Sequence, residues 1–393
     1  MKSKIKQILL FGVVSSFCSS CFFDFLKKEK DGPAAIPSFD LCDPAVRDFL
    51  ETYDADKEYD ILKNRAQPSC GYQFIDLDIP NNISNSFVYY DTDPNFSNPY
   101  FYSPDYGNNT LALPGQKYYY RVYSLKGDDE DRLYTYDLDF IKSMPTKSEL
   151  IKEGSFTTKG GGVRFCNISG LSNLRDLGGW KTTDGKVVKY NKLFRGPAVD
   201  SLNKTAEIEL KGQLGIKTEI DLRYGTSLTS SCFAENFLYA GIQAYDSINP
   251  NKIGYGSYNK KSIQDIFSYL GNENNYPMYY HCAVGCDRTG TLSFLINGAL
   301  GVPLKDLTKD FELSSFSNYG YRCRGPLSLP YRYGMFQNDS QNYVNWGALS
   351  SLVINVDKTG TLPFKECVIK FLVDNYEVPL SDIESMQRIM LGD

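Results

Sequence analysis

The chain has 393 residues, of which 42% are apolar and 23% charged, so it is long enough to bury more than one hydrophobic core. Its formal net charge of -5, with the lysines scattered along the chain, excludes long-range attraction for nucleic acid as the basis of its function. The chain has 1 histidine, and the cysteines from Cys21 onward form no CxxC pair, which excludes the usual structural zinc sites. We therefore expect neither a metal nor another cofactor.

The N-terminus, residues 1–20, is predicted to be a signal peptide for export. Lysines at alternate positions precede a short apolar stretch, Ile8–Phe17, which is too short for a membrane span of about 20 residues. The stretch leads into CSSC, and small residues before a cysteine resemble the lipobox of bacterial lipoproteins. The resemblance implies that Cys21 is lipidated and anchors the protein to a membrane of a bacterial cell envelope. The alternative is an ordinary cleaved signal.

Residues 21–57 are predicted to be a polar tether with one short helix, because Asp43 and Pro44 form a typical helix start. Residues 58–159 then consist of short alternating runs separated by Asn, Asp, Pro and Gly, which predicts an all-β sandwich. The run LALPGQKYYYRVYSL resembles a late strand of fibronectin type III and immunoglobulin-like domains. A spacer or docking role is expected for this part, and Cys42 with Cys70 is a candidate disulfide.

Three consecutive glycines in TTKGGGVRF, residues 157–165, predict a linker, after which the pattern becomes α/β. GIKTEIDLR and MYYHC read as buried strands, and TGTLSFLINGAL reads as a helix with one apolar face. The last segment predicts two helices broken at Val378-Pro379, the second capped by Ser381 with Glu384. Residues 165–393 are thus expected to form an α/β domain with a central, mostly parallel sheet flanked by helices.

The stretch YYHCAVGCDRTG carries the chemistry. Cys282 follows a predicted strand, and the loop after it opens onto a helix, so backbone N–H groups and the helix N-terminus favour an anion there. The same field favours a thiolate over a thiol. Arg288, six residues on, can donate two hydrogen bonds to a phosphate. A nucleophilic cysteine, loop amides and an arginine together indicate phosphoryl transfer through a cysteinyl-phosphate intermediate.

His281-Cys282-x₅-Arg288-Thr289 matches the HCx₅R(S/T) signature of cysteine-dependent protein tyrosine phosphatases. The loop resembles that of bacterial tyrosine phosphatases reading HCxxGKDRTG. NLRDLGGW, KVVKYNKLFRGPAVDSL, GIKTEIDLR and VPLSDIESMQRIML resemble further segments of that family, in the same order. The resemblance spans residues 165–393 and implies the fold and activity of that superfamily.

The resemblance implies roles for individual residues. Cys282 is the nucleophile and Arg288 the phosphate clamp; the remaining phosphate-binding residues are Ala283, Val284, Gly285, Cys286, Thr289 and Gly290. His281 orders the loop and transfers no proton. Arg175 and Asp176 either form a structural ion pair or contact the substrate. Arg223 either meets a second phosphate or a substrate carboxylate, or pairs with Asp221.

Two departures from the family pattern matter. Cys286 replaces a lysine, which removes a positive charge; it is either a neutral replacement or a resolving cysteine that forms a disulfide with an oxidised Cys282. No loop of the kind that supplies the general acid is recognisable. Asp287 is the favoured acid because it lies beside the clamp arginine, although it can equally hold the loop's shape, and Asp221 and Asp246 are the alternatives.

The sequence therefore predicts an exported, membrane-anchored phosphatase that hydrolyses phosphate monoesters, with phosphorylated protein as the expected substrate. The first alternative is a phosphoinositide or inositol phosphate phosphatase, because the CxxGxDR loop also resembles that of myotubularin-type lipid phosphatases. The second is a catalytically silent surface binding protein. The intact Cys282, Arg288 and Thr289 argue against silence. The oligomeric state cannot be predicted from these patterns.

Overall fold

The computed structural model describes residues 35–64, 75–79, 86–102, 111–126, 148–168, 170–226, 228–254, 256–319, 322 and 339–392. The predicted signal peptide, Cys21 and Cys70 lie outside these residues. Everything from Ser38 onward belongs to one compact unit, Ser38–Asp393, which contains two five-stranded sheets. No helix among the described residues is both long and apolar enough to cross a membrane.

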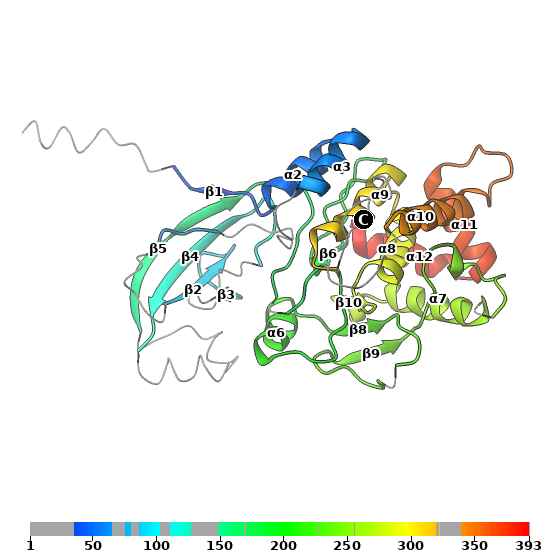
Figure 1. The fold of residues 1–393 in the computed structure, drawn as a ribbon. Coiled ribbons are helices and arrows are strands. Elements are labelled where there is room, and N and C mark those ends of the chain that lie inside the picture. The colour runs from blue at the N-terminus through cyan, green and yellow to red at the C-terminus, as the bar shows by residue number, and fades with distance from the viewer. Residues whose placement is uncertain are drawn as a thin grey trace, which may run out of the picture. The chain divides into compact units, whose positions relative to one another are not determined.

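The first sheet comes from the N-terminal half of the unit (Figure 1) and has the strand order β1-β5-β4-β2-β3. Its strands are antiparallel except for β1, which pairs in parallel with β5. They comprise β1 (Ser38–Phe39), β2 (Ser86–Asp91), β3 (Tyr100–Tyr102), β4 (Lys117–Ser124) and β5 (Glu149–Thr158). All six residues of β2 are buried, because one face of the sheet packs around Tyr90 and Phe156 and the other around Phe87 and Tyr89.

This sheet only partly matches the prediction for residues 58–159. A sandwich needs a second facing sheet, and the described residues of this range form only one, so the sandwich stays a prediction. The predicted boundary at residue 58 falls inside helix α3 (Ala55–Asn64). Helix α2 (Pro44–Glu51) begins as predicted, with the Asp43 side chain accepting from the Ala45 N–H and proline in the first turn. Cys42 is a free thiol that donates to the Val163 carbonyl.

The second sheet has the order β6-β7-β10-β8-β9 and is parallel except for its edge strand β6. This agrees with the expected mostly parallel sheet. Its strands are β6 (Arg175–Asp176), β7 (Leu193–Gly196), β8 (Thr218–Asp221), β9 (Asn236–Tyr239) and β10 (Met278–His281). β10 is the central strand, and all of its residues are buried.

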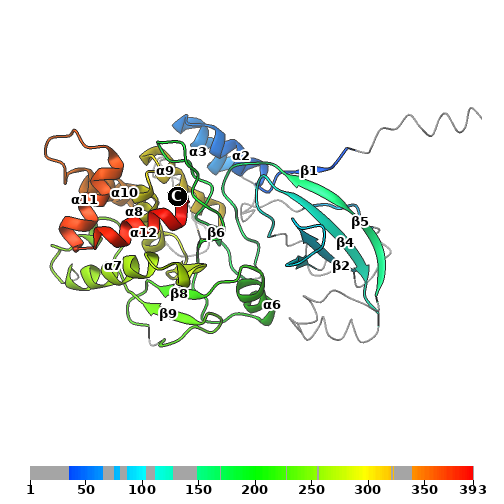
Figure 2. The same cartoon turned by 180° about the vertical axis from the view of Figure 1, so that it is seen from behind.

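Helices cover both faces of this sheet (Figure 2). Met278 and Tyr280 face a large core that includes Leu292 and Ile296 of α8, whereas Tyr279 faces a smaller core with Ala206 of α6. The helices and helical turns of this half are α6 (Lys204–Ile208), η2 (Glu209–Gln213), η3 (Tyr245–Ile248), α7 (Gly256–Leu270), η4 (Glu273–Asn275), α8 (Asp287–Leu300), α9 (Leu304–Glu312), η5 (Leu313–Phe316), α10 (Asp339–Ile354), α11 (Phe364–Tyr376) and α12 (Leu380–Leu391).

The last two helices confirm the predicted break at Val378-Pro379. The predicted cap of the second one is wrong. Helix α12 begins at Leu380 directly after Pro379, and no side chain caps it. A proline in the N-cap position starts the helix two residues earlier than Ser381 would, so Ser381 lies inside the first turn.

Candidate active site

The loop from Cys282 to Cys286 connects the central strand β10 to helix α8. β10 runs parallel to both β7 and β8, so the carboxyl ends of three strands meet where Cys282 begins the loop. Cys282 is 4% exposed. This places the thiol at the sheet edge where α/β folds bind ligands and at the N-terminal end of a 14-residue helix, which favours an anion.

Gly285 allows the loop its tight path. Its φ of +72° lies in the left-handed region, and a Cβ added there would lie 2.5 Å from the backbone of Gly196 on β7. The loop is further fastened to the segment after β7, where the Ala198 N–H donates to the Ala283 carbonyl over 3.1 Å. The strand–loop–helix prediction thus holds, and β7 supplies the surface against which the loop is shaped.

A buried charge cluster lies beneath the loop. Arg195 Nη2 donates to the Gly285 carbonyl over 2.9 Å, and its Nη1 donates to Asp310 Oδ2 on α9 over 2.5 Å. Arg175 Nε donates to the other oxygen of Asp310 over 3.3 Å. Both arginine side chains are 0% exposed, so burial and the neighbouring Arg195 lower the pKa of Arg175 to about 10. Two guanidiniums facing one carboxylate leave net positive charge under the loop.

Asn173 binds the other side of the loop and contacts the Cys286 thiol. Its amide Nδ2 donates to the Val284 carbonyl over 3.2 Å and to Cys286 Sγ over 3.3 Å. Cys286 is fully buried, and burial raises the pKa of its thiol to about 11. A neutral, buried thiol favours the neutral replacement over the resolving cysteine. The resolving role of Cys286 stays a prediction. The positive charge that a lysine would add is replaced in part by Arg195 and Arg175.

The two residues that follow Asp287 present unused hydrogen-bonding groups. Arg288 is partly exposed, and no hydrogen bond or ion pair joins it to any residue that the structure describes. Thr289 Oγ1 is buried and has no hydrogen-bond partner among those residues. Buried polar atoms normally have partners, so the Thr289 hydroxyl is suited to a bound anion at the loop. The Arg288 guanidinium is suited to it by its charge and its fork of N–H donors.

Asp287 is tied into a network of its own. Arg322 donates to its two oxygens over 2.8 and 3.0 Å, and the Tyr245 hydroxyl donates to Oδ1. Burial raises the pKa of this carboxyl, but the attraction of Arg322 and its hydrogen bonds outweigh burial and hold the pKa below its usual value. An ionised carboxylate with both oxygens engaged has no proton to donate. The geometry therefore favours the loop-shaping role of Asp287 over the acid role.

Of the two alternative acids, only one reaches the surface. Asp221 is 0% exposed and is paired with Arg223 at 2.7 Å. Asp246 lies on η3, is half-buried, and pairs with Lys252 at 3.5 Å. The preceding residue, Tyr245, anchors η3 to the start of α8 through the bond from its N–H to Thr291 Oγ1, 2.8 Å. Asp246 is thus the accessible carboxylate of the three.

The supporting residues have structural partners. His281 is fully buried between Glu219 Oε1, 2.9 Å from its Nε2, and the stacked ring of Tyr279. This fits the predicted loop-ordering role. Arg175 and Asp176 do not pair with each other; Asp176 pairs instead with Arg164 at 3.1 Å.

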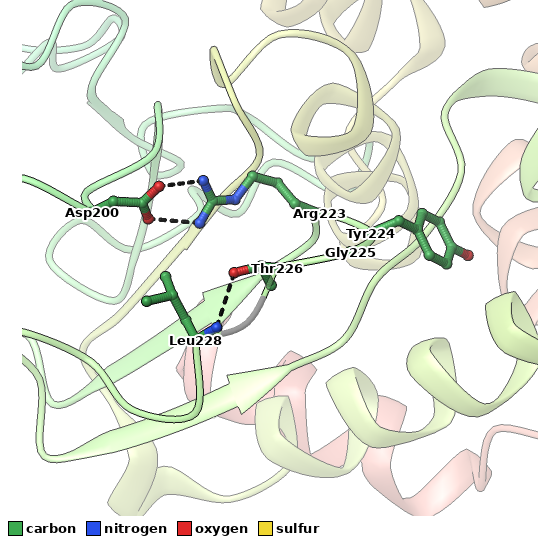
Figure 3. A pocket seen from close by; sticks show the side chains of 6 residues that line it. All are labelled: Asp200, Arg223, Tyr224, Gly225, Thr226 and Leu228. Carbon is green, nitrogen blue, oxygen red and sulfur yellow. Dashed lines mark hydrogen bonds and ion pairs between the residues drawn. The ribbon is translucent and has the colours of Figure 1, made fainter.

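Arg223 pairs with both Asp221 and Asp200. The pair with Asp221 is one of the alternatives predicted for Arg223. Arg223 lines a cavity of about 390 Å³ (Figure 3). Among the described residues, no group of three or more His, Cys, Asp or Glu side chains is placed to hold a metal ion.

The sequence patterns missed the residues that hold the loop from a distance: Arg195, Asp310, Arg322, Asn173 and Tyr245. They also missed Asp200, the second partner of Arg223. Arg195 and Asn173 lie inside two of the segments that resemble the family, KVVKYNKLFRGPAVDSL and NLRDLGGW, which is the signal that points to them. Asp310 stands in an ordinary amphipathic helix, and nothing local distinguishes it.

Comparison with known proteins agrees with this geometry. The model of the tyrosine phosphatase family matches residues 166–322, which include Cys282, Arg288 and Arg322. The matches support a phosphatase of the tyrosine phosphatase superfamily. A Cupriavidus necator protein named "Putative tyrosine-protein phosphatase" is 26% identical over 172 residues, which is 38% of this chain. The chain covers 62% of the length of that relative.

One solved structure is similar to part of this chain. It is the core catalytic domain of the PP-IP phosphatase SIW14 from S. cerevisiae, in complex with citrate. The match covers 32% of this chain and 71% of that domain, at 16% sequence identity and a TM-score of 0.25.

Proposed function

We propose that the chain hydrolyses phosphate monoesters through a cysteinyl-phosphate intermediate, with phosphotyrosine in proteins as its substrate. The observation that carries this is the sequence of groups at one loop: the buried Cys282, then Arg288 and the Thr289 hydroxyl, neither of which has a hydrogen-bond partner among the described residues. The match of residues 166–322 to the tyrosine phosphatase family supports it. The intact set of reactive groups speaks against a silent binding protein.

The reaction proceeds in two displacements. The Cys282 thiolate attacks phosphorus, the bond from phosphorus to the leaving oxygen breaks, and that oxygen takes a proton from Asp246. Loop N–H groups and the Arg288 guanidinium stabilise the charge on the transferring phosphoryl group. Water then attacks phosphorus, its proton passes to Asp246, the S–P bond breaks, and inorganic phosphate leaves.

Two substitutions and one trapping experiment test this function. We expect Cys282→Ser to abolish phosphate release from phosphotyrosine peptides while retaining binding of phosphotyrosine, because the backbone cradle is unchanged. Arg288→Lys should lower kcat by at least about 10²-fold, since one ammonium cannot make the two parallel bonds of a guanidinium. Rapid acid quenching followed by mass spectrometry should find phosphate on Cys282 of the wild type. Unchanged turnover in Cys282→Ser would refute the proposal.

Inositol phosphates and phosphoinositides form the second substrate class. It follows from the loop's resemblance to lipid phosphatases, and the same assay should include both.

The lipid anchor is also a proposal from the sequence alone. Incorporation of a radiolabelled fatty acid into the wild type, lost in Cys21→Ala, would support the anchor, and equal labelling of both would exclude it.

A further inference from the structure

A second polar site adjoins the phosphate loop. Asp200, Arg223, Tyr224, Gly225, Thr226 and Leu228 line the cavity of about 390 Å³ in Figure 3. Two backbone bonds place it beside the catalytic strand: the Leu222 N–H donates to the His281 carbonyl over 2.9 Å, and the Ala198 N–H donates to the Ala283 carbonyl over 3.1 Å. Arg223 is the residue after Leu222, and Asp200 lies two residues after Ala198. A substrate bound at Cys282 therefore has this cavity as its neighbour.

Arg223 has its donors occupied by two carboxylates. Its Nη1 and Nη2 each donate to one oxygen of Asp200 over 2.6 Å, as the paired dashed lines in Figure 3 show. Its Nε and Nη2 donate to Asp221 over 3.0 and 2.7 Å. The fork that would grip a phosphate with two parallel bonds is thus already filled by Asp200. One guanidinium faces two carboxylates, so this group carries net negative charge at neutral pH.

The two carboxylates differ in how easily they can be replaced. Asp221 is 0% exposed and is held within the sheet, whereas the Asp200 side chain is 44% exposed. A second phosphate entering the cavity would have to displace Asp200 from the fork and would be repelled by its charge. A ligand with one phosphate, bound at the loop alone, meets neither obstacle. Charge placed against the wrong ligand is a common means of selectivity.

We propose that Asp200 is a specificity-determining residue, which occupies the fork of Arg223 and so excludes substrates that carry a second phosphate next to the one being hydrolysed. This inference rests on the proposed function and narrows it to monophosphate esters such as phosphotyrosine. It predicts that removing the charge of Asp200 turns Arg223 into a receptor for a second phosphate.

The test compares two ligands that differ only in the second phosphate, myo-inositol 4-monophosphate and myo-inositol 4,5-bisphosphate. Binding to the full chain carrying Cys282→Ser is measured by calorimetry, with and without Asp200→Asn. The ratio of bisphosphate to monophosphate affinity should rise on the order of tenfold in Asp200→Asn, the worth of a charge-assisted bidentate contact. Using the ratio removes any general effect of the substitution on the loop.

Three variants complete the experiment. Asp374→Asn removes one carboxylate of a surface pair on α11 and should leave the ratio unchanged. Asp200→Asn combined with Arg223→Lys should lose the gain, since lysine keeps a charge beside Asp221 but has no fork. Asp200→Ser replaces Asp200→Asn if the asparagine lowers the Tm. An unchanged ratio in a folded Asp200 variant, or an equal rise in Asp374→Asn, would overturn the proposal.

The proposed function and the proposed role of Asp200 can be separated in the chain with Cys282 intact. There, the ratio of kcat/KM for the bisphosphate to kcat/KM for the monophosphate is measured with and without Asp200→Asn. A raised affinity ratio without any Cys282-dependent turnover would contradict the proposed function and support the role of Asp200. Cys282-dependent turnover would support the function. If Asp200→Asn then changed neither the affinity ratio nor the kcat/KM ratio of bisphosphate to monophosphate, the role of Asp200 would be contradicted.

Discussion

At the scale of single residues, the surroundings of each carboxylate decide its role. Asp287 is the aspartate closest in sequence to the clamp arginine, yet Arg322 and Tyr245 bind its oxygens and keep it ionised. Asp246 has one weak ion pair and reaches solvent beside the same helix start. Proximity in sequence therefore favours Asp287 as the general acid, whereas the hydrogen bonding favours Asp246.

Leaving groups of different basicity distinguish these two aspartates. A general acid contributes about 10²–10⁴-fold when the leaving oxygen is basic and little when it is not. We expect Asp246→Asn to hydrolyse phenyl phosphate much more slowly than the wild type, and dinitrophenyl phosphate at nearly the wild-type rate. Asp287→Asn should be impaired equally with both, because it disturbs the loop. If Asp287→Asn instead shows the leaving-group dependence, the assignment of the acid to Asp246 is wrong.

At the scale of the element, the phosphate loop depends on its neighbours as much as on its own residues. β7 packs directly against Gly285, and α9 supplies the carboxylate that holds Arg195 and Arg175 under the loop. These contacts come from the sheet order, in which β10 lies between β7 and β8. These contacts hold the loop without involving a phosphate, which is what a preorganised anion site requires.

Gly285→Ala tests this dependence. The substitution adds backbone strain of about 1–2 kcal/mol for a left-handed residue and a clash with Gly196. We expect turnover and vanadate affinity to fall together, measured by steady-state kinetics and inhibition. The control is Gly185→Ala, where φ is +88° but a Cβ meets nothing within 4 Å. Equal losses in both variants would show that strain, and not the contact with β7, causes the effect.

At the scale of the whole molecule, α9 joins the N-terminal helices to the candidate active site. Lys309 is buried and donates to the carbonyls of Phe49, Leu50 and Thr52 at the end of α2. It also pairs with Glu58 of α3 at 3.3 Å. The next residue is Asp310, the partner of the arginines under the loop. Residues 44–64 are therefore packed onto the same helix that supports the site.

Lys309→Met measures the strength of this connection. Leaving Glu58 and three carbonyls without their partner in a buried site should lower the free energy of unfolding by about 3–5 kcal/mol. Thermal unfolding should show a lower Tm, and hydrogen exchange should show faster opening of α2. Lys305→Met is the matched control, because Lys305 is exposed and lies over the ring of Tyr53; surface changes of this kind stay within about 0.5 kcal/mol. Similar losses in both would argue against the buried contact.

The sequence by itself determined the features that arise from neighbouring residues. The order of strand, loop and helix around Cys282, the spacing to Arg288, the start of α2 at Asp43 and the break before Pro379 all follow from local backbone preferences. The resemblance to the tyrosine phosphatase superfamily also follows from such short segments. These signals are readable because each depends on only a few consecutive residues.

Only the tertiary structure decided which partners the buried charges have. Asp310 is 115 residues from Arg195 and 135 from Arg175, and Arg322 is 35 from Asp287. From the sequence, Arg175 and Asp176 either form an ion pair with each other or contact the substrate. In the fold, Arg175 pairs with Asp310 and Asp176 pairs with Arg164. A buried charge is stabilised by whichever opposite charge the packing brings within reach, and that depends on how distant segments meet.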